Sequence, residues 1–484
     1  MARVLFIQNL FMEQLGVMSL SAVLKANGHD VRLAIGNDAE IIKIAREYKP
    51  HIIGATVLTG FQRRWARLAK TIKENLKEKP LVVFGGPHPT FFPETVLLEG
   101  VDAVCRGEGE GAIVELADAC DGAKWNEDIL LEAMSKVRNI SFSAPASSGE
   151  QKLVVNPMRK LEDVNKLPYP DRGISFAYRF VREDPNVHFL AGRGCPYSCS
   201  FCFNKKMREL CEGLGGAVRR RNPENVIDEI EHVHRRWGIK VVYFQDDTFI
   251  LDRGWLIQFL EEYRRSLKLP LYCTVRADIL TEEVAYALKD AGCYRVSFGV
   301  ESGVEKIRNE VLHKKISDNQ IRITAQILKK AGLTFQTTNM MGLPGEKFED
   351  AFQTLKLNIE IGADVAWTSI YQPYPGTELG ERTLYEGYIE NFPDNETIAD
   401  AHTASVLNQP DIAKLERLQK LAYMAVKFPT LHPIIRQLAN FDMPRLFYWI
   451  HRISYLLFYF RKITKMSLKR TIEEAVIAFK YYRH

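Results

Sequence analysis

Short apolar runs alternate with amphipathic stretches along the first 120 residues, and this alternation predicts strands joined by helices. The runs are apolar on both faces, which is the pattern of a parallel sheet covered by helices on both sides. The predicted strands are Val4–Ile7, Val31–Ile35, Ile52–Val57, Leu81–Gly86 and Ala103–Gly107. The predicted helices are Gly16–Ala26, Ala39–Tyr48, Phe61–Leu76 and Glu94–Glu99. This part is therefore expected to be α/β, with a doubly wound, Rossmann-like parallel sheet.

The alternation resumes at His188 and continues through a further series of strand–helix units. The predicted strands are His188–Gly192, Val241–Gln245, Leu271–Val275, Arg295–Val300, Thr334–Met340 and Val365–Ile370. The predicted helices are Pro223–Trp237, Arg253–Ser266, Glu282–Ala291, Asp318–Ala331 and Lys347–Ile361. This repeat predicts a partial (β/α)6 barrel of the TIM type, in which chemistry takes place at the carboxyl ends of the strands.

Two breaks in the pattern divide the chain. Residues 121–172 show no regular period, and Ser143–Gly149 is expected to be an exposed hairpin tip or loop. Leu167–Arg172 is expected to be an extended linker, because proline disfavours helix at the residue before it. After Gly380 the chain becomes helical. The predicted parts are a first domain over 1–125, a connector over 126–180, a barrel over 181–385 and a helical C-terminal region over 386–484.

Composition narrows the class of protein. The net charge of +5 is small for 484 residues, so no nucleic-acid partner is expected. The eight cysteines lack the paired spacing of a secreted disulfide scaffold. The N-terminus runs directly into a predicted strand and does not have the form of a signal peptide. No uncharged apolar run approaches the roughly 18 to 20 residues of a spanning helix. A reducing cytoplasm is the expected location.

Cys195, Cys199 and Cys202 follow the first barrel strand with the spacing C-x3-C-x2-C. Cysteines this close in sequence do not form a disulfide framework, but their thiolates can converge on one soft metal site. Three ligands to a cubane iron–sulfur cluster leave one iron open. A structural zinc site is the alternative, but zinc usually takes four ligands in paired spacing and the sequence has no second pair. The motif therefore predicts cluster ligands.

Polar and glycine residues gather where the predicted strands end. In the barrel these segments are Asp246-Asp247, Arg276 to Asp278, Glu301-Ser302-Gly303, Gly342 to Glu346 and Gln372 to Gly376. In the first domain they are Thr56–Gly60, Gly85–Thr90 and Arg106–Gly111. Glycine allows a flat ligand to approach the backbone closely. Taken alone, the glycine-rich ends fit a nucleotide, a flavin or simple turn geometry equally well.

The cysteine motif and the barrel strand ends together resemble the radical S-adenosylmethionine (radical SAM) family across residues 188–380. The resemblance implies a four-iron four-sulfur cluster on the three cysteines, with the amino and carboxylate groups of S-adenosylmethionine (SAM) on the open iron. Phe201 would then lie against adenine, and Arg276 suits the carboxylate because a guanidinium forms bidentate pairs. The residues that the resemblance assigns to SAM are Phe201, Asp246, Arg276, Glu301, Ser302, Gly342 and Gly345.

The first domain resembles the cobalamin-binding domain that precedes many radical SAM domains. The resemblance rests on Gly85–Thr90 with Glu94, and on the run Gly107-Glu108-Gly109-Glu110. It implies cobalamin contacts by Thr56, Gly86, His88, Gly107 and Glu108. The D-x-H-x-x-G motif of many such domains is absent from Gln8–Gly16. No histidine of that motif would therefore bind cobalt, and a base-off cobalamin is expected.

The C-terminal segment from Leu446 to Phe460 is densely aromatic, and basic residues follow it. Residues 431–484 contain ten Lys and Arg against three Asp and Glu. An aromatic face beside a basic face is typical of an interfacial membrane helix, although a helix that packs on the barrel would show a similar pattern. The first interpretation predicts peripheral contact with the inner face of a membrane through residues 444–470. It places Phe447, Trp449, Tyr455 and Phe458 toward the bilayer.

The resemblance implies an enzyme that cleaves SAM reductively to a 5′-deoxyadenosyl radical and methylates an unactivated carbon with a methyl group from cobalamin. A small hydrophobic or lipid-like substrate and an electron donor such as flavodoxin or ferredoxin are expected partners. A cobalamin-containing radical SAM enzyme that closes a ring or oxidises carbon is the alternative, and a non-catalytic cobalamin sensor is the third possibility. A methylthio transferase would need three further N-terminal cysteines, and only Cys105 and Cys120 are present there. The sequence assigns no catalytic acid or base.

Overall fold

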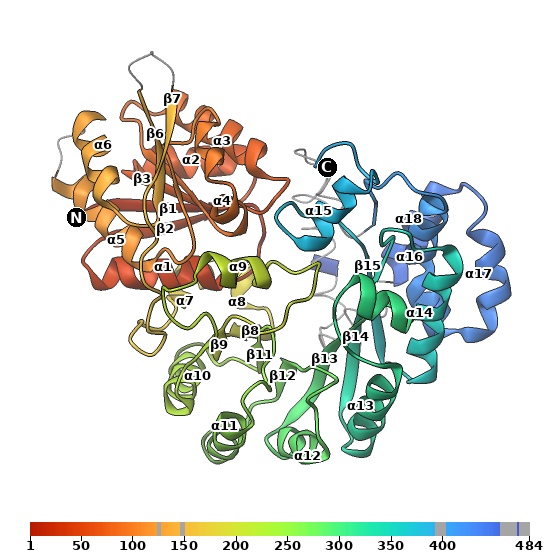
Figure 1. Ribbon diagram of the computed structural model, residues 1–484. Helices are drawn as coiled ribbons and strands as arrows, with labels where there is room; N and C mark the ends of the chain where they lie inside the picture. The colour runs from red at the N-terminus through yellow and green to blue at the C-terminus, as the bar shows by residue number, and fades with distance from the viewer. Residues whose placement is uncertain (123–126, 146–150, 393–402, 455–471, 474–484) are drawn as a thin grey trace.

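The computed structural model describes residues 1–122, 127–145, 151–392, 403–454 and 472–473. Its first sheet has seven strands in the order β2-β1-β3-β4-β5-β6-β7 and lies at the N-terminal side of the molecule (Figure 1). The first five strands are parallel. They are β1 (Arg3–Gln8), β2 (Asp30–Ile35), β3 (Ile52–Thr56), β4 (Leu81–Gly85) and β5 (Ala103–Cys105). The predicted N-terminal parallel sheet is confirmed.

Helices cover both faces of this sheet. On one face, Val17 of α1 (Leu15–Ala26) and Ile113 of α5 (Glu110–Gly122) are buried in the same core cluster as Phe6 of β1. On the other face, α2 (Asp38–Tyr48) and α3 (Gln62–Asn75) bury Ile41 and Trp65 against the opposite side chains of the strands. The short helix α4 (Pro87–Phe91) and the 3-10 turn Pro93–Leu97 follow β4. Burial on both faces explains why these strands are apolar at nearly every position.

The first sheet continues beyond residue 125, where the sequence placed the end of the first domain. Helix α6 (Glu127–Lys136) is followed by β6 (Ile140–Pro145) and β7 (Gln151–Val155), which form an antiparallel hairpin on β5. Of the predicted loop Ser143–Gly149, residues 143–145 lie in β6 and the rest lies outside the described residues. Strand β7 was missed because it is half-buried or exposed along its length and so lacks an apolar run. Strand β6 was also missed, although its first three residues are buried.

The second sheet has six parallel strands in the order β15-β14-β13-β12-β11-β8. The strands are β8 (Asn186–Phe189), β11 (Val241–Phe244), β12 (Leu271–Thr274), β13 (Cys293–Glu301), β14 (Thr334–Met341) and β15 (Val365–Ile370). The helices between them are α10 (Pro223–Trp237), α11 (Arg253–Ser266), α12 (Glu282–Asp290), α13 (Asp318–Lys330) and α14 (Phe348–Glu360). The predicted six-stranded partial barrel is therefore confirmed.

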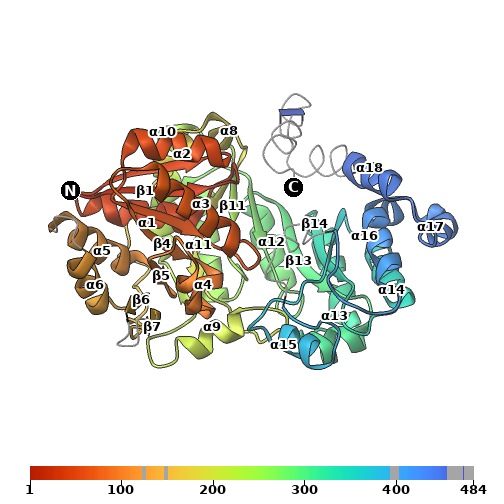
Figure 2. The same ribbon diagram turned by 90° about the horizontal axis from the view of Figure 1, so that it is seen from above.

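The described C-terminal region is helical, as predicted. It comprises α15 (Glu378–Tyr385), α16 (Ile412–Lys427), α17 (His432–Leu438) and α18 (Pro444–Ser454). Helix α16 packs on β15 and α14, and Figure 2 shows α16 to α18 on the side of the barrel away from the first domain. No helix within the described ranges is long and apolar enough to cross a membrane.

A buried ion network joins the two halves. Arg172 begins α7 (Arg172–Phe176), which lies between the two sheets with α8 (Arg179–Arg182) (Figure 1). Its guanidinium is about 1% exposed and pairs with Glu13 of the first domain and with Glu229 of α10, the latter at 3.0 Å. Glu13 also accepts a hydrogen bond from the backbone N–H of His188 at 2.8 Å.

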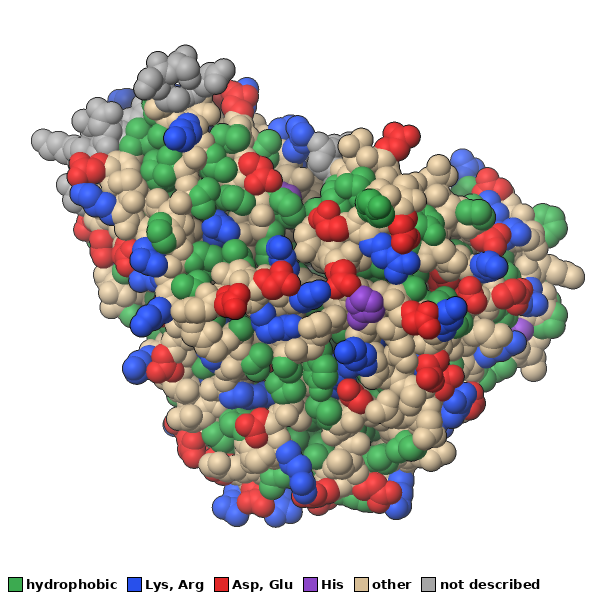
Figure 3. Space-filling view, in the orientation of Figure 1, with side chains coloured by type: hydrophobic (Ala, Val, Ile, Leu, Met, Phe, Trp, Pro, Cys, Tyr) green, Lys and Arg blue, Asp and Glu red, His purple; other side chains and the backbone are tan. Residues whose placement is uncertain are grey.

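On the face shown in Figure 3, acidic and basic side chains are interspersed.

Candidate active site

A cavity of about 470 Å³ lies between the two halves of the molecule. The first domain contributes strand-end residues that include Thr56, Gly85, Gly86 and Gly107 to Glu110. The other half contributes residues close to the cysteine motif, among them Arg193, Gly194, Phe203, Asn204 and Asp247. Four of the predicted cobalamin contacts, Thr56, Gly86, Gly107 and Glu108, thus border one cavity.

Glycines keep part of this cavity wall free of side chains. A Cβ atom added to Gly16 or Gly85 would meet no protein atom within 4 Å, so both glycines face open space. At Gly86 the backbone has φ +94°, and a Cβ would lie 2.9 Å from the methyl carbon of Thr56. The bare backbone therefore leaves room for a large flat ligand, which fits the corrin ring of cobalamin.

Glu108 and Glu110 face arginines of the other half instead of projecting freely into the cavity. Arg193 donates to Glu108 and to Glu110, each at 2.6 Å, and Arg219 donates to Glu108 at 2.7 Å. Burial alone would raise the pKa of Glu108, but the hydrogen bonds and charges of Arg219 and Arg193 outweigh it and hold that pKa below its usual value. Glu108 thus connects the strand ends of the first sheet to the chain that leads into Cys195.

His88 lies in α4 and is not among the residues that line the cavity. Its Nδ1 atom is 3.1 Å from the hydroxyl of Thr59, and its ring lies beside that of Phe92. Burial lowers its pKa to about 4, which keeps the ring neutral. The predicted contact between His88 and cobalamin receives no support from this placement and stays a prediction.

The three predicted cluster ligands lie on one loop between β9 (Gly192–Arg193) and α9 (Asn204–Leu210). Cys199 is buried, and Cys195 and Cys202 are half-buried. Arg208 of α9 donates to the carbonyl oxygens of Cys195 and Tyr197, which curls the loop around the start of that helix. Within the described ranges, no three His, Cys, Asp or Glu side chains are grouped closely enough to hold a single metal ion.

The donor set on this loop is three sulfur atoms with few competing partners. The amide of Asn204 lies 3.5 Å from the sulfur of Cys202, and a guanidinium nitrogen of Arg276 lies 3.9 Å from that of Cys199. Burial raises the pKa of the Cys195 and Cys202 thiols, so their thiolate forms need a nearby positive charge. Iron would supply that charge, and thiolates are the usual ligands of iron–sulfur clusters.

The cysteine loop is fixed to a second segment of the barrel. The backbone N–H of Ser200 donates to the carbonyl of Leu312 at 3.0 Å, and its hydroxyl donates to the carbonyl of Val311 at 2.6 Å. Arg276 lies 3.6 Å from the ring centre of Tyr197 and donates to the carbonyl of Lys314. The predicted SAM residue Arg276 is therefore already engaged with the cysteine loop and with residues 311–314.

The two adjacent acids after β11 face different surroundings. Asp246 is 5% exposed and accepts hydrogen bonds from the backbone of Ala191 at 2.9 Å and from Arg220 at 3.2 Å. Burial raises the pKa of Asp246 to about 6. Asp247 instead lines the cavity, and burial raises its pKa as well. Asp246 is thus held by hydrogen bonds at the end of the strand, whereas Asp247 can reach a ligand in the cavity.

Glu301 forms a buried ion pair that the sequence did not predict. Lys314 donates to its carboxylate at 2.7 Å, and both side chains are at most 10% exposed. The ammonium group of Lys314 also lies 6.0 Å from the ring centre of Phe201, directly before Cys202. Ser302 is fully buried, and its hydroxyl accepts from the N–H of Val304 at 3.3 Å. A carboxylate, an ammonium group and an aromatic ring therefore meet beside the cysteine loop.

Gly342 and Gly345 form a tight turn at the end of β14, with φ +76° and +74°. Within this turn, Glu346 accepts from the backbone N–H groups of Gly342 and Leu343 at 2.6 and 3.2 Å. Glu346 is 2% exposed, and burial raises its pKa to about 8. Because their φ angles are positive, Gly342 and Gly345 occupy backbone conformations that other residues rarely adopt. The glycines in the sequence indicated a turn here, but the hydrogen bonds through which Glu346 holds the turn were not predicted.

Two family models match the chain in the order of the two halves described above. The model of the B12 binding domain matches residues 9–117, and the model of the radical SAM superfamily matches residues 189–357. The first match covers β2 to β5, and the second runs from Phe189, the last residue of β8, into α14. The first model contains the glycine-rich cavity wall, and the second contains the three cysteines and the Glu301–Lys314 pair.

Similar proteins match this chain across most of its length. An uncharacterized methyltransferase of Pyrococcus horikoshii is 32% identical over 422 residues, which cover 84% of this chain and 87% of that protein. An anaerobic magnesium-protoporphyrin IX monomethyl ester cyclase of Rubrivivax gelatinosus is 29% identical and covers 75% of this chain, while the match spans 65% of the cyclase.

The fold also matches a solved structure of the radical SAM methyltransferase TsrM from Kitasatospora setae with cobalamin and an iron–sulfur cluster bound. That structure has a TM-score of 0.62 at 18% identity and covers 80% of this chain and 75% of its own. Taken together with the two family models, these similarities show that the chain belongs to the cobalamin-binding radical SAM enzymes, with a four-iron four-sulfur cluster, SAM and cobalamin as cofactors and with methyltransferases among its relatives.

Proposed function

We propose that this enzyme methylates an unactivated carbon atom of a small hydrophobic or lipid-like molecule. The observation that carries the proposal is the single cavity bordered both by the glycine-rich strand ends of the first sheet and by Asn204 and Asp247 near the cysteines. A shared cavity allows a methyl donor and a substrate to meet in a fixed orientation. When bound, the cluster and SAM supply a 5′-deoxyadenosyl radical, and cobalamin supplies the methyl group.

In this proposal Cys195, Cys199 and Cys202 hold the cluster, and the Lys314–Glu301 pair receives the charged end of SAM. An ammonium group suits the carboxylate of SAM, and a carboxylate suits its amino group. Phe201 and the turn Gly342–Gly345 remain the predicted adenine contacts. Arg276 acts mainly by holding Tyr197, Cys199 and Lys314 in place, because its donors already point to these residues.

On the cobalamin side, Thr56, Gly86 and Gly107 are proposed to contact the corrin ring or its tail. Apolar residues that line the same cavity, including Val83, Ile113 and Leu116, would hold the tail of cobalamin. Glu108 serves this site indirectly, through the ion pairs that hold the two halves together. An external electron donor such as flavodoxin or ferredoxin is proposed to reduce the cluster.

Oxidative ring closure is the alternative reaction, and the identity to the anaerobic cyclase of Rubrivivax gelatinosus favours it. Both reactions would use the same cluster, SAM and cobalamin. They differ in the fate of the methyl group, because a cyclase leaves no carbon from SAM in its product. A cobalamin sensor has no use for a cysteine loop within a radical SAM barrel.

Replacing Cys195, Cys199 and Cys202 together with alanine is expected to abolish iron and sulfide binding and all cleavage of SAM, because no other sulfur ligands are placed on this loop. The matched control is Cys120→Ala, at a buried cysteine in the first domain, which is expected to retain the cluster. Iron and sulfide analysis of anaerobically purified protein measures the difference. A triple variant with a full iron complement would contradict the assignment.

Methylation predicts that carbon from the methyl group of SAM appears in the product. The measurement incubates the reduced enzyme with SAM labelled with ¹³C in its methyl group and an extract of small molecules and lipids, followed by mass spectrometry. A labelled product whose formation requires both cobalamin and the three cysteines is the expected result. A product that has lost hydrogen but carries no label would support ring closure or oxidation instead.

The lipid-like substrate is supported by an exposed apolar stripe on α18. Leu446, Trp449 and Ile453 are 44%, 61% and 50% exposed and recur at helical spacing on one face. Arg452 lies over the ring of Tyr448 on the neighbouring face. We propose that this stripe and Arg452 contact an anionic membrane surface.

Phe447, which was expected to face the bilayer, is instead 1% exposed in the core beneath α18. Tyr455 and Phe458 lie outside the described residues.

A variant with Leu446, Trp449 and Ile453 changed to serine is expected to lose binding to anionic vesicles, because it removes the apolar part of the contact. Wild-type binding is expected to weaken as salt rises, because salt screens the charge of Arg452. Co-sedimentation with phosphatidylglycerol vesicles measures both effects, and Ile323→Ser, at an exposed site on α13, is the control. Wild-type protein that stays in the supernatant at low salt would remove the support for a lipid-like substrate.

A further inference from the structure

The segment from Glu301 to Asp318 has an unusual backbone. Glu301, His313 and Lys315 have positive φ values of +63°, +50° and +56°. A π-helical turn, Ile307–Val311, lies between them. A positive φ is unfavourable for a residue other than glycine, and such conformations persist only where surrounding contacts hold them. Short π-helical turns likewise occur frequently at functional sites.

One side chain makes most of the contacts that hold this segment. Arg308 lies within the π-helical turn, and its side chain is fully buried. Its guanidinium donates to the carbonyl of Ser302 at 2.6 Å, to the carbonyl of Ile316 at 2.7 Å and to the carboxylate of Asp318. Its own carbonyl accepts from the N–H of Lys314 at 3.0 Å. Arg308 thus connects the beginning, the middle and the end of the segment.

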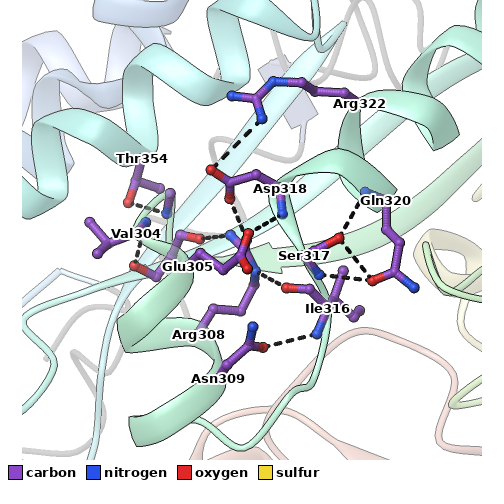
Figure 4. Close-up of polar contacts among 12 residues, drawn as sticks. Val304, Glu305, Arg308, Asn309, Ile316, Ser317, Asp318, Gln320, Arg322 and Thr354 are labelled. Carbon is purple, nitrogen blue, oxygen red and sulfur yellow. Dashed lines mark hydrogen bonds and ion pairs between the residues drawn. The ribbon is translucent and has the colours of Figure 1, made fainter.

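Neighbouring residues form further hydrogen bonds and ion pairs within the same segment, as Figure 4 shows. Glu305 lies 3.8 Å from Arg308 and accepts from the N–H of Asp318 at 2.6 Å. Asn309 accepts from the N–H of Ile316 at 2.9 Å. Arg322 approaches Asp318 from the outer side at 3.8 Å but is 39% exposed and also pairs with Glu360. Arg308 is therefore the buried brace, and Arg322 is a surface partner of the same carboxylate.

The closed segment presents its residues to the cysteine loop. Val311 and Leu312 accept hydrogen bonds from Ser200 through their carbonyls. Lys314 accepts from Arg276 through its carbonyl and reaches Glu301 through its side chain. If the segment opened, Lys314 would lose its place beside Phe201 and the cysteine loop would lose two of its hydrogen bonds.

We propose that Arg308 is a positioning residue for SAM binding, which holds the strained segment Glu301–Asp318 closed so that Lys314 and Glu301 face the cofactor beside the cysteine loop. The inference rests on the proposed function of the Lys314–Glu301 pair. Arg308 is completely enclosed and contacts Ser302, Ile316 and Asp318, so it acts through the backbone of the segment and not by touching SAM.

The test compares Arg308→Lys with Arg322→Ala in the anaerobically reconstituted full-length enzyme. Lysine keeps the charge but cannot donate to both carbonyls and to Asp318 with a planar fork. Equilibrium titration with SAM is expected to show affinity weakened at least about tenfold in Arg308→Lys, the scale of one lost hydrogen bond from a charged group. Amide hydrogen exchange in residues 302–318 is expected to become faster. Arg322→Ala is expected to match wild type in both.

A double variant separates positioning from general damage. If Arg308 acts through Lys314, adding Arg308→Lys to Lys314→Met is expected to weaken SAM binding no further than Lys314→Met alone. Should Arg308→Lys fail to accumulate, Asp318→Asn is the substitute, because it removes the negative charge of one group that accepts from Arg308 and keeps the shape of that side chain. The same titration and exchange measurements are expected to shift in the same direction.

The possible failures are distinguishable. Wild-type affinity for SAM in Arg308→Lys, with weakened affinity in Lys314→Met, would overturn the role of Arg308 and leave the proposed function standing. Weakened affinity for SAM in Arg308→Lys without faster exchange in residues 302–318 would also overturn it. A wild-type enzyme that holds its cluster but binds no SAM would overturn the proposed function itself.

Discussion

Charged side chains join the two halves of this enzyme where they meet. Arg193 pairs with Glu108 and Glu110 at 2.6 Å, and Cys195 follows it by two residues along the chain. A second network, Glu13–Arg172–Glu229, is almost fully buried and connects the loop before α1 to α10. Buried ion pairs add little net stability because desolvation offsets their attraction, but removing one partner leaves a costly unpaired charge. Such networks favour one arrangement of the two halves over others.

That arrangement determines what the cavity can do. The same run Gly107–Glu110 supplies bare backbone to the cavity and carboxylates to the ion network, so the cobalamin side and the cysteine side are positioned by neighbouring residues. On the far side of the cysteine loop, the backbone of residues 311–314 supports Ser200 and Arg276. The loop with the three cysteines is therefore held from both directions, by α9 and by the barrel segment after β13.

Apolar periodicity was sufficient to predict both sheets, because strands buried on both faces are apolar at nearly every position. It failed for β6 and for β7, which lies at the sheet edge. Strand alternation could not separate Asp246 from Asp247, because both lie beyond Phe244, the last residue of β11. Apolar periodicity could not predict the Glu301–Lys314 pair. Lys314 reaches Glu301 because the chain between them forms a π-helical turn and has positive φ at Glu301 and His313. Phe447 was misplaced because its neighbours on α16 cannot be read from the sequence of α18 alone.

We infer that cobalamin binds in the cavity between the two halves, close to the cluster on the neighbouring cysteine loop. Electron paramagnetic resonance of the enzyme carrying both cob(II)alamin and the reduced cluster tests it most directly, because two unpaired spins that lie close together relax and broaden each other. Reducing the cluster is expected to broaden the cob(II)alamin signal and to speed its relaxation, and the triple cysteine variant is expected to show neither effect. A cob(II)alamin signal that is unchanged by cluster reduction in the wild-type enzyme would show that the two cofactors do not lie close together.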